Sequence, residues 1–269
     1  DIAGEEAFVA AAFIPNEPRF LGLAAGQGVQ LWRQERGQST RVAALSHGAP
    51  VSSLDFHALQ ALLGSAGDDG RVLLWDAQSQ QLLRTLPLGS AELSACRFPG
   101  GSGFYEYLVA ASGLDGNVHV WDIRRPSEVR RMRGTDAGMC LTSHPGSHLL
   151  AVGSLDGLVS TWDSRTWSVW NRLDVRSQLG SQRAHPRSLA ASPCGAFLAA
   201  GCEDGELLIF DLQRQSYMFR VLHHSDAVTG LAWGGRTDWV DAPHFVACAS
   251  LDGSWSCWAH SRSAVPGEY

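Results

Sequence analysis

The sequence predicts an all-β protein assembled from repeated four-stranded antiparallel units. An Asp-Gly pair recurs along the chain and is followed, after a short strand, by an aromatic residue. These aromatic residues lie 43, 46, 41, 48 and 48 residues apart, which is the length that four short strands and their turns require. They are Trp32, Trp75, Trp121, Trp162, Phe210 and Trp258. No stretch shows the long periodicity typical of an amphipathic helix.

Each repeat divides into four strands, as the second repeat illustrates. Val51–Phe56 alternates as a first, inner strand, and Leu62–Ser65 is the second strand. Asp69-Gly70 supplies the tight turn, because glycine adopts a positive φ without strain. Val72–Trp75 is the third strand and Leu82–Leu86 the outer one. The first strands of the other repeats are predicted to begin at Phe8, Leu93, Gly138, Arg187 and Val228.

The repeat is clearest in closely related copies of the turn and the third strand. They read GDDGRVLLWD from Gly67, GLDGNVHVWD from Gly113, SLDGLVSTWD from Ser154, CEDGELLIFD from Cys202 and SLDGSWSCWA from Ser250, with a degenerate copy, AAGQGVQLWR, from Ala24. This pattern resembles the WD-repeat (WD40) family over almost the whole chain. The resemblance implies a β-propeller, a ring of four-stranded blades around a central channel, formed by a single domain over residues 1–269.

The number of blades is left open by the sequence. Six repeats are visible, whereas seven is the most common number in the family that the chain resembles. The residues before Phe8 are too few for a further outer strand and its connection. Either the ring has six blades, or a seventh lies outside this numbering, or another chain closes it. We expect a ring that is incomplete as numbered.

The resemblance also implies a structural network that joins a loop His, a turn Asp and a strand Trp in each blade. The second repeat supplies His47, Asp69 and Trp75, and the sixth supplies His224, Asp252 and Trp258. The third and fourth repeats lack a His at the matching place but keep Asp115 with Trp121 and Asp156 with Trp162. In the fifth repeat, Phe210 replaces Trp and His185 is too close to the next strand to match.

Composition excludes several classes of protein. The net charge is −6 and the isoelectric point about 5.9, which argues against a broad surface for nucleic acid or anionic membranes. No apolar run reaches the length of a membrane span. The chain starts at Asp1 without a leader, so we expect the numbering to start inside a longer protein. Because every basic residue is Arg, lysine-dependent chemistry is excluded.

The cysteines predict reduced thiols and a cytoplasmic or nuclear location. They stand at positions 96, 140, 194, 202, 248 and 257, and none forms a C-x-x-C pair. A hairpin turn at Asp252-Gly253 would place Cys248 opposite Cys257. A disulfide between them is one alternative, and two buried free thiols are the favoured one.

Catalytic motifs are missing from the sequence. It contains no G-x-S-x-G elbow, no H-E-x-x-H helix, no Walker sequence and no G-x-G-x-x-G after a strand. The Asp residues recur at one position of every repeat, which indicates turn formation rather than acid–base chemistry. We therefore predict that the protein is not an enzyme, with no catalytic residue, cofactor, metal or small-molecule substrate.

Three features are candidate partner-binding sites, because function on a repeat scaffold usually lies in its loops. The connection Asp174–Pro186 carries Arg176 and Arg183, and a loop on the opposite face carries Trp239. Arg124 and Arg165 close two W-D-x-R boxes, which resemble those of substrate receptors for cullin-RING ubiquitin ligases. The favoured interpretation is a non-enzymatic scaffold subunit of a multi-protein assembly. A ligase substrate receptor is one alternative, and a propeller hydrolase is another.

Overall fold

The protein is all-β, as the sequence predicts. The computed structural model describes residues 8–14, 17–35, 38–57, 59–89, 91–100, 106–125, 127–144, 146, 148–180, 184–234 and 244–260. Within these ranges the strands form six antiparallel sheets, five of four strands and one of three, together with one short helix. In every sheet the strands follow one another in chain order, which is the topology of a β-propeller blade.

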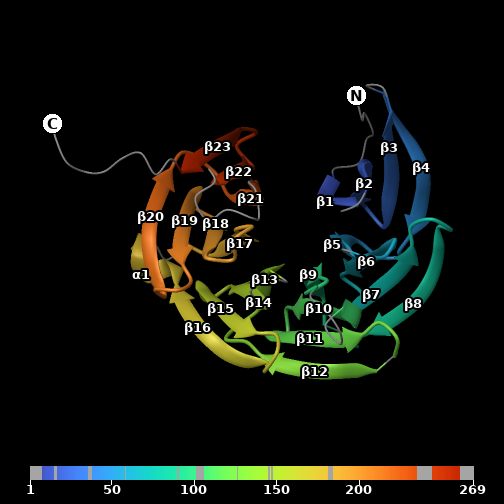
Figure 1. Ribbon diagram of the computed structural model, residues 1–269, viewed down its shortest axis with the longest axis horizontal. Helices are drawn as coiled ribbons and strands as arrows, with labels where there is room; N and C mark the ends of the chain where they lie inside the picture. Colours follow the sequence, from blue (N-terminus) through green and yellow to red (C-terminus); the bar gives the residue numbers. More distant parts are fainter. Residues whose placement is uncertain are drawn as a thin grey trace. The chain divides into compact units, whose positions relative to one another are not determined.

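The chain divides into two compact units, Asp1–Leu141 and Thr142–Tyr269. The first unit carries three sheets (Figure 1). Their strands are β1 (Phe8–Ile14), β2 (Glu17–Ala25), β3 (Gly28–Glu35), β4 (Gln38–Ser46), β5 (Val51–Phe56), β6 (Leu62–Gly67), β7 (Arg71–Asp76), β8 (Gln81–Pro87), β9 (Leu93–Arg97), β10 (Leu108–Gly113), β11 (Asn117–Asp122) and β12 (Glu128–Arg133).

The remaining sheets belong to the second unit, except that the boundary falls inside the first strand of the fourth sheet. Their strands are β13 (Gly138–His144), β14 (Leu149–Ser154), β15 (Leu158–Asp163), β16 (Ser168–Asp174), β17 (Pro186–Ala191), β18 (Phe197–Cys202), β19 (Glu206–Asp211), β20 (Ser216–Leu222), β21 (Val228–Gly234), β22 (His244–Ser250) and β23 (Trp255–His260). The first strands therefore begin where the sequence predicts, with a difference of one residue at Pro186.

Consecutive sheets within a unit pack face to face through apolar side chains. In the first unit, the buried clusters that contain Trp75 and Trp121 join the first sheet to the second and the second to the third. In the second unit, Ile209 and Val228 join the fifth sheet to the sixth. Among the first strands, β5 contacts both β1 and β9, and β4, β8 and β12 lie at the opposite edge of their unit (Figure 1). The outer strands are thus the exposed margins of the blades.

The Asp-Gly turns lie between the second and third strands, as predicted, but their loops are one residue longer than a two-residue hairpin. In the second blade, Gly70 has a φ of 71° and its N–H donates to the Gly67 carbonyl at 3.2 Å. Ala66 pairs with Val72, so the turn is centred on Asp69 rather than between Asp69 and Gly70. A type I turn followed by a left-handed glycine produces this odd loop.

The odd loop corrects the expectation for Cys248 and Cys257. Cys248 pairs with Ser256, and Cys257 pairs with Ala247. Successive strand residues point to opposite faces, so the two thiols do not share a face. Cys248 is buried, and burial raises the pKa of its thiol to about 11, whereas Cys257 is exposed. The disulfide alternative is therefore wrong, and the prediction of two free thiols is confirmed, but the prediction that both are buried is wrong for Cys257.

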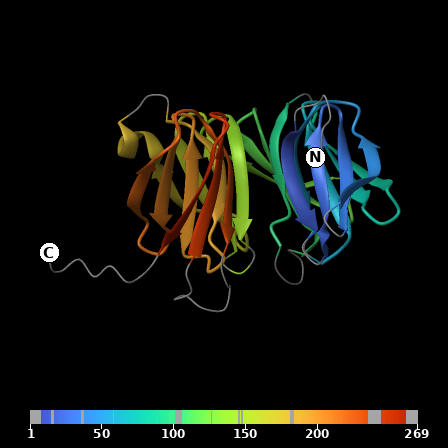
Figure 2. The same ribbon diagram turned by 90° about the horizontal axis from the view of Figure 1, so that it is seen from above.

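The connection Asp174–Pro186 contains the short helix α1 (Val175–Leu179), which the sequence analysis did not predict. Asp174 caps its start by accepting from the Ser177 N–H, and Gly180 ends it with a φ of 66°. Both residue types are typical of these helix ends. Figure 2 shows α1 at one end of the strands of the second unit, where it forms part of the loop surface.

Candidate partner-binding site

The His, Asp and Trp of the second blade are joined through a serine. His47 Nδ1 lies 2.9 Å from Ser65 Oγ, and His47 Nε2 lies 3.3 Å from Asp69 Oδ1. The indole N–H of Trp75 donates to the same Ser65 oxygen at 3.0 Å. Burial lowers the pKa of His47, although the charge of Asp69 opposes this shift. Ser65 and the side chain of His47 are fully buried, so this network stabilises the blade.

In the sixth blade the linking hydroxyl comes from the neighbouring strand. His224 Nδ1 lies 3.2 Å from Asp252 Oδ2, and His224 Nε2 lies 2.9 Å from Ser256 Oγ. Trp258 donates its indole N–H to Ser256 at 3.0 Å. Ser256 pairs across the sheet with Cys248, which occupies the position that Ser65 has in the second blade. The serine has thus changed strands while the network has kept its connections.

The third blade replaces the loop His by a His on its third strand, which the sequence analysis missed. His119 is fully buried, two residues before Trp121. Its Nε2 lies 3.1 Å from Asp115 Oδ2, and its Nδ1 lies 2.6 Å from Glu128 Oε1. Burial favours a raised pKa for both carboxyl groups, but hydrogen bonds from Asn117, Arg131 and His119 outweigh it, and the pKa of each is lowered.

In the fourth blade, Arg176 of α1 lies over the Asp-Gly turn. Its Nη2 donates to the Leu155 carbonyl at 2.8 Å and lies 3.0 Å from His185 Nδ1. Its aliphatic stem packs against Gly157. Asp156 accepts from the Leu158 N–H at 3.0 Å. The side chain of Arg176, a candidate for partner binding, is therefore used within the blade.

In the fifth blade, the Asp that takes the network position is Asp204. Both carboxylate oxygens of Asp204 are buried and make no hydrogen bond to any described residue. The position that holds Ser65 in the second blade is Ala200 here, and Leu208 stands opposite it. His185 pairs with Arg176 instead, as its position close to the strand suggests.

The turn between β11 and β12 holds Arg124 against an acidic and an aromatic neighbour. Its Nε and Nη2 donate to the two carboxylate oxygens of Asp122 at 2.9 and 2.7 Å. The guanidinium lies 4.1 Å from the ring centre of Tyr107. These hydrogen bonds lower the pKa of Asp122, whose side chain is only 1% exposed, whereas that of Arg124 is 48% exposed.

Arg165, in the corresponding turn of the fourth blade, lines a pocket of about 310 Å³. Its Nη2 donates to Asp163 Oδ2 at 2.6 Å, which lowers the pKa of Asp163. Ser168, Val169 and Trp170 complete the wall of the pocket. Trp170 is 41% exposed, although an indole is costly to leave in water. Trp170 could not be predicted from the repeated motif, because it does not belong to it.

Two further candidates, Trp239 and Arg183, lie outside the described residues. In the part of the chain that is described, no three His, Cys, Asp or Glu side chains gather as a possible metal site. No helix in that part is long and apolar enough to cross a membrane.

Comparisons with known proteins agree with this architecture. A model of the WD domain, G-beta repeat, matches residues 39–76, and a model of the nucleolar protein 10-like N-terminal domain matches residues 126–240. The chain is a WD-repeat protein. The WD-repeat motif at residues 39–76 spans the outer strand of the first blade and three strands of the second, including His47, Asp69 and Trp75.

Curated relatives of this WD-repeat chain are distant. Transcription initiation factor TFIID subunit 5 of Caenorhabditis elegans is 29% identical over 67% of the chain and 26% of its own length. GATOR2 complex protein WDR24 of Danio rerio is 28% identical over 88% of the chain and 30% of its own length. A ribosome biogenesis protein WDR12 homolog of Chlamydomonas reinhardtii is 25% identical over 84% of the chain and 58% of its own length. The chain thus spans between about a quarter and three fifths of these relatives.

Proposed function

We propose that the chain is a non-enzymatic scaffold that holds other proteins in a multi-protein assembly. The observation that carries the proposal is the pocket beside Arg165, where a partly exposed Trp170 and a guanidinium lie together. Trp and Arg are the residue types that most often dominate the binding energy of protein interfaces. A partner side chain that fills the pocket would bury the exposed indole.

The buried networks support the non-enzymatic part of the proposal. Ser65, His47 and Asp69 have the residue types of a nucleophilic triad, but Ser65 is fully buried and its oxygen already accepts from Trp75. A substrate carbonyl would have to reach that oxygen for nucleophilic attack. The networks are therefore assigned to holding strands and loops together.

The relatives support the scaffold role in a general way. Two of them carry names that describe a subunit of transcription initiation factor TFIID and a protein of the GATOR2 complex. A role inside a larger assembly is the property that those names share. We extend it to this chain without choosing one of these assemblies, and expect a nuclear or cytoplasmic location.

The ubiquitin-ligase alternative depends on what the two guanidinium groups do. A receptor would offer Arg124 and Arg165 to an adaptor, and both side chains are about half exposed. However, each donates two hydrogen bonds to the Asp of its own W-D-x-R box. An adaptor would have to share or replace these bonds, so the scaffold remains the favoured function.

A quantitative pull-down from the native source tests the proposal. The bait is the full protein, compared with a double variant, Arg165→Glu with Trp170→Ala, that empties the pocket. Arg172→Glu, on the same outer strand and exposed, is the matched control for charge. We expect a fixed set of proteins to be retained by the wild type and the control and to fall about tenfold or more with the double variant. Equal recovery by all three baits would contradict the assignment of this pocket.

Loss of a cullin adaptor with Arg124→Glu and Arg165→Glu would favour the receptor.

A further inference from the structure

The third blade concentrates unpaired positive charge at its outer strand. Arg125 lies in the turn before β12, and Arg130 and Arg133 lie on β12; all three are exposed. Among the described residues, none of the three has an ion pair or a side-chain hydrogen bond, whereas Arg131 donates to Glu128 at 3.0 and 3.3 Å. In a chain of net charge −6, this cluster of positive charge favours the binding of an acidic partner.

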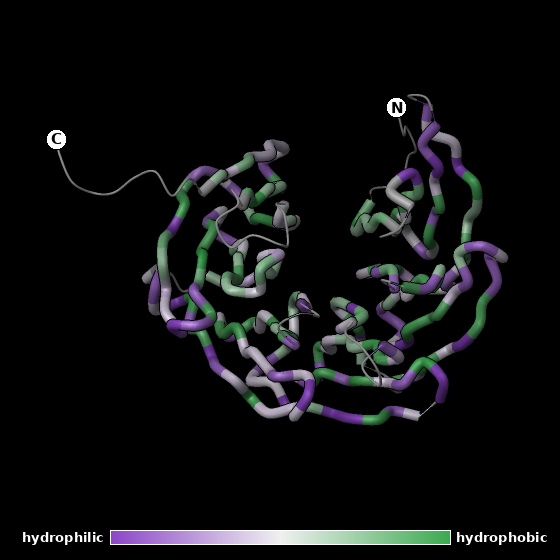
Figure 3. Tube along the Cα trace, in the orientation of Figure 1, coloured by the Kyte–Doolittle hydropathy of each residue, from purple (hydrophilic) through white to green (hydrophobic). Residues whose placement is uncertain are grey.

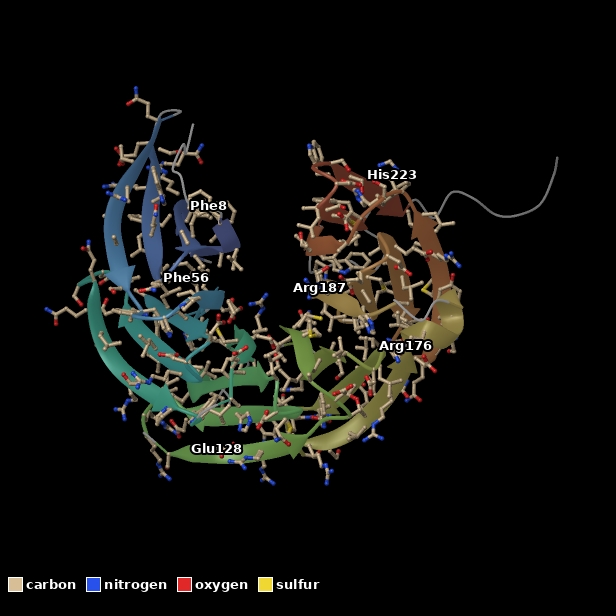
Figure 4. The ribbon with its side chains drawn as sticks, turned by 180° about the vertical axis from the view of Figure 1, so that it is seen from behind. Phe8, Phe56, Glu128, Arg176, Arg187 and His223 are labelled. Carbon is tan, nitrogen blue, oxygen red and sulfur yellow. The ribbon has the colours of Figure 1, made fainter. Side chains whose placement is uncertain are left out.

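β12 also has a free backbone edge within its sheet. It is the last strand in the order β12-β11-β10-β9, so only one of its sides pairs with another strand of the sheet. Nitrogen-tipped side chains point away from the ribbon along the strand that carries Glu128 (Figure 4), and the same strand is mostly hydrophilic (Figure 3). Unpaired N–H and C=O groups on such an edge can hydrogen-bond to an added strand.

Charge on an edge strand can also serve to prevent unwanted strand pairing. The other outer strands among the described residues, β4, β8, β16 and β20, carry one arginine each, against three on β12, which itself exposes Val129. β8 exposes Leu82 and Leu83, and β16 exposes Val169 and Trp170. Charge is thus not a general protection of the outer edges in this chain, and the arginines of β12 require a separate explanation.

We infer that β12 binds an acidic, extended segment of a partner protein, which adds to its free edge as a further strand. This inference rests on the proposed scaffold function and names the chemistry of one partner. Each guanidinium can donate two parallel hydrogen bonds to a carboxylate. Arg130 and Arg133 point to opposite faces of the strand, because side chains alternate. Acidic side chains on both faces of the added strand, with one more near Arg125, match this arrangement.

Carboxylates among the arginines favour a peptide over a nucleic acid. A polar pocket of about 480 Å³ beside the start of β11 is lined by Asp115 and Asp136 together with Arg131 and Arg133. Glu128 lies at the beginning of the same strand. A continuous phosphate backbone would be repelled by these carboxylates, whereas a peptide can place its charges only opposite the unpaired arginines.

Fluorescence anisotropy tests the inference with a defined probe. The probe is a labelled decapeptide built from Glu-Glu-Thr-Thr repeats, which places Glu on both faces of an extended strand, titrated with the full protein at low salt. In the test variant, Arg125, Arg130 and Arg133 are all changed to Gln, which leaves Glu128, Arg131 and His119 in place. In the matched control, Arg41, Arg172 and Arg214 are changed to Gln; they are also exposed, two on outer strands and one in a turn. We expect saturable binding that weakens about tenfold in the test variant and less than twofold in the control.

Two further probes separate strand addition from simple charge attraction. A peptide of the same sequence with N-methyl groups on alternate residues keeps its charge but loses backbone donors, so we expect much weaker binding. Equal binding of both peptides, equal loss in both triple variants, or no binding at all would overturn the inference. Tighter binding of an oligo-dT strand that is lost in the test variant would also overturn it, in favour of nucleic acid. If the pull-down through the Arg165 pocket succeeds while the peptide fails, the scaffold role stands and only this partner is rejected.

Discussion

At the scale of residues, the position two before the closing aromatic supplies a polar partner in three blades, whereas in the second blade Ser65 of the preceding strand supplies it. In the first blade Gln30 occupies it and accepts from the Trp32 indole at 3.1 Å. In the third and sixth blades the same position holds His119 and Ser256. The sequence shows these polar residues on an otherwise apolar strand, and this signal could have found them. Pairing of these buried groups avoids the cost of an unpaired one; the indole nitrogen of Trp121, which makes no hydrogen bond to any described residue, is an exception in the third blade.

Trp75 and Trp170 are predicted to differ in their effect on stability. Trp75 is only 6% exposed and belongs to a core cluster, so Trp75→Ala should lower the free energy of unfolding by about 3–5 kcal/mol. Trp170→Ala, at an exposed position, should cost about 0.5 kcal/mol or less. Urea denaturation measures both, and equal losses would refute the assignment of Trp75 to the core.

The two W-D-x-R arginines are also predicted to differ. The carboxylate of Asp122 is buried, so Arg124→Glu would place a second negative charge beside a group with little access to water. We expect a loss of about 1–3 kcal/mol. Asp163 is 23% exposed, and Arg165→Glu should cost about 0–1 kcal/mol. The sequence alone suggests that both are surface pairs of equal and small weight; denaturation curves that show equal losses would support that simpler description.

The stability of the folded protein is expected to depend on pH through the carboxyl groups of Asp115 and Glu128. Their pKa values are lowered in the folded protein, so the folded state binds fewer protons than the unfolded state in acid. Their contribution is present above the ordinary carboxyl pKa of about 4 and is lost as the pH falls through the lowered values. The double variant Asp115→Asn with Glu128→Gln should be less stable than wild type at pH 7, and the difference in melting temperature should shrink in acid. A constant difference would contradict this prediction.

At the scale of elements, the repeat spacing places the strands well but leaves their register uncertain by one residue. Strand starts follow from alternation and from the turn residues, which act locally. Turn length depends on how Asp and Gly divide the φ angles between them, and Asp-Gly occurs in both two-residue and three-residue loops. Helix α1 could have been predicted from the sequence, because Asp174 and Gly180 are ordinary capping residues.

Equivalent turn glycines provide a test of packing at this scale. Gly205 and Gly253 have φ angles of 86° and 79°, so alanine is similarly strained at both. A methyl group at Gly205 would collide with the carbonyl of His224 in the following loop, whereas no described residue lies within 4 Å of one at Gly253. We expect Gly205→Ala to lower the melting temperature clearly more than Gly253→Ala does. The reverse order would show that the loop does not pack on the turn.

At the scale of the whole molecule, the fold could be predicted from the sequence, and the proposed partner-binding surfaces could be predicted only in part. A motif that recurs from blade to blade marks structure, even where single copies have lost the His, and it identified His47, Asp69 and Trp75 from the sequence. A binding surface is formed by residues that differ from one blade to the next. Trp170 and the unpaired arginines of β12 become visible only when exposure and ion pairing are known.

The central claim is that the chain works as an assembly subunit without catalysis of its own. The most direct measurement is sedimentation of the full native protein in a gentle extract, followed by stoichiometric mass spectrometry of its fractions. We expect the protein to sediment well above its own mass, with other proteins in constant ratio, and the double variant at Arg165 and Trp170 to shift toward the free protein. Sedimentation of the wild type alone, at the mass of a single copy, would contradict the claim.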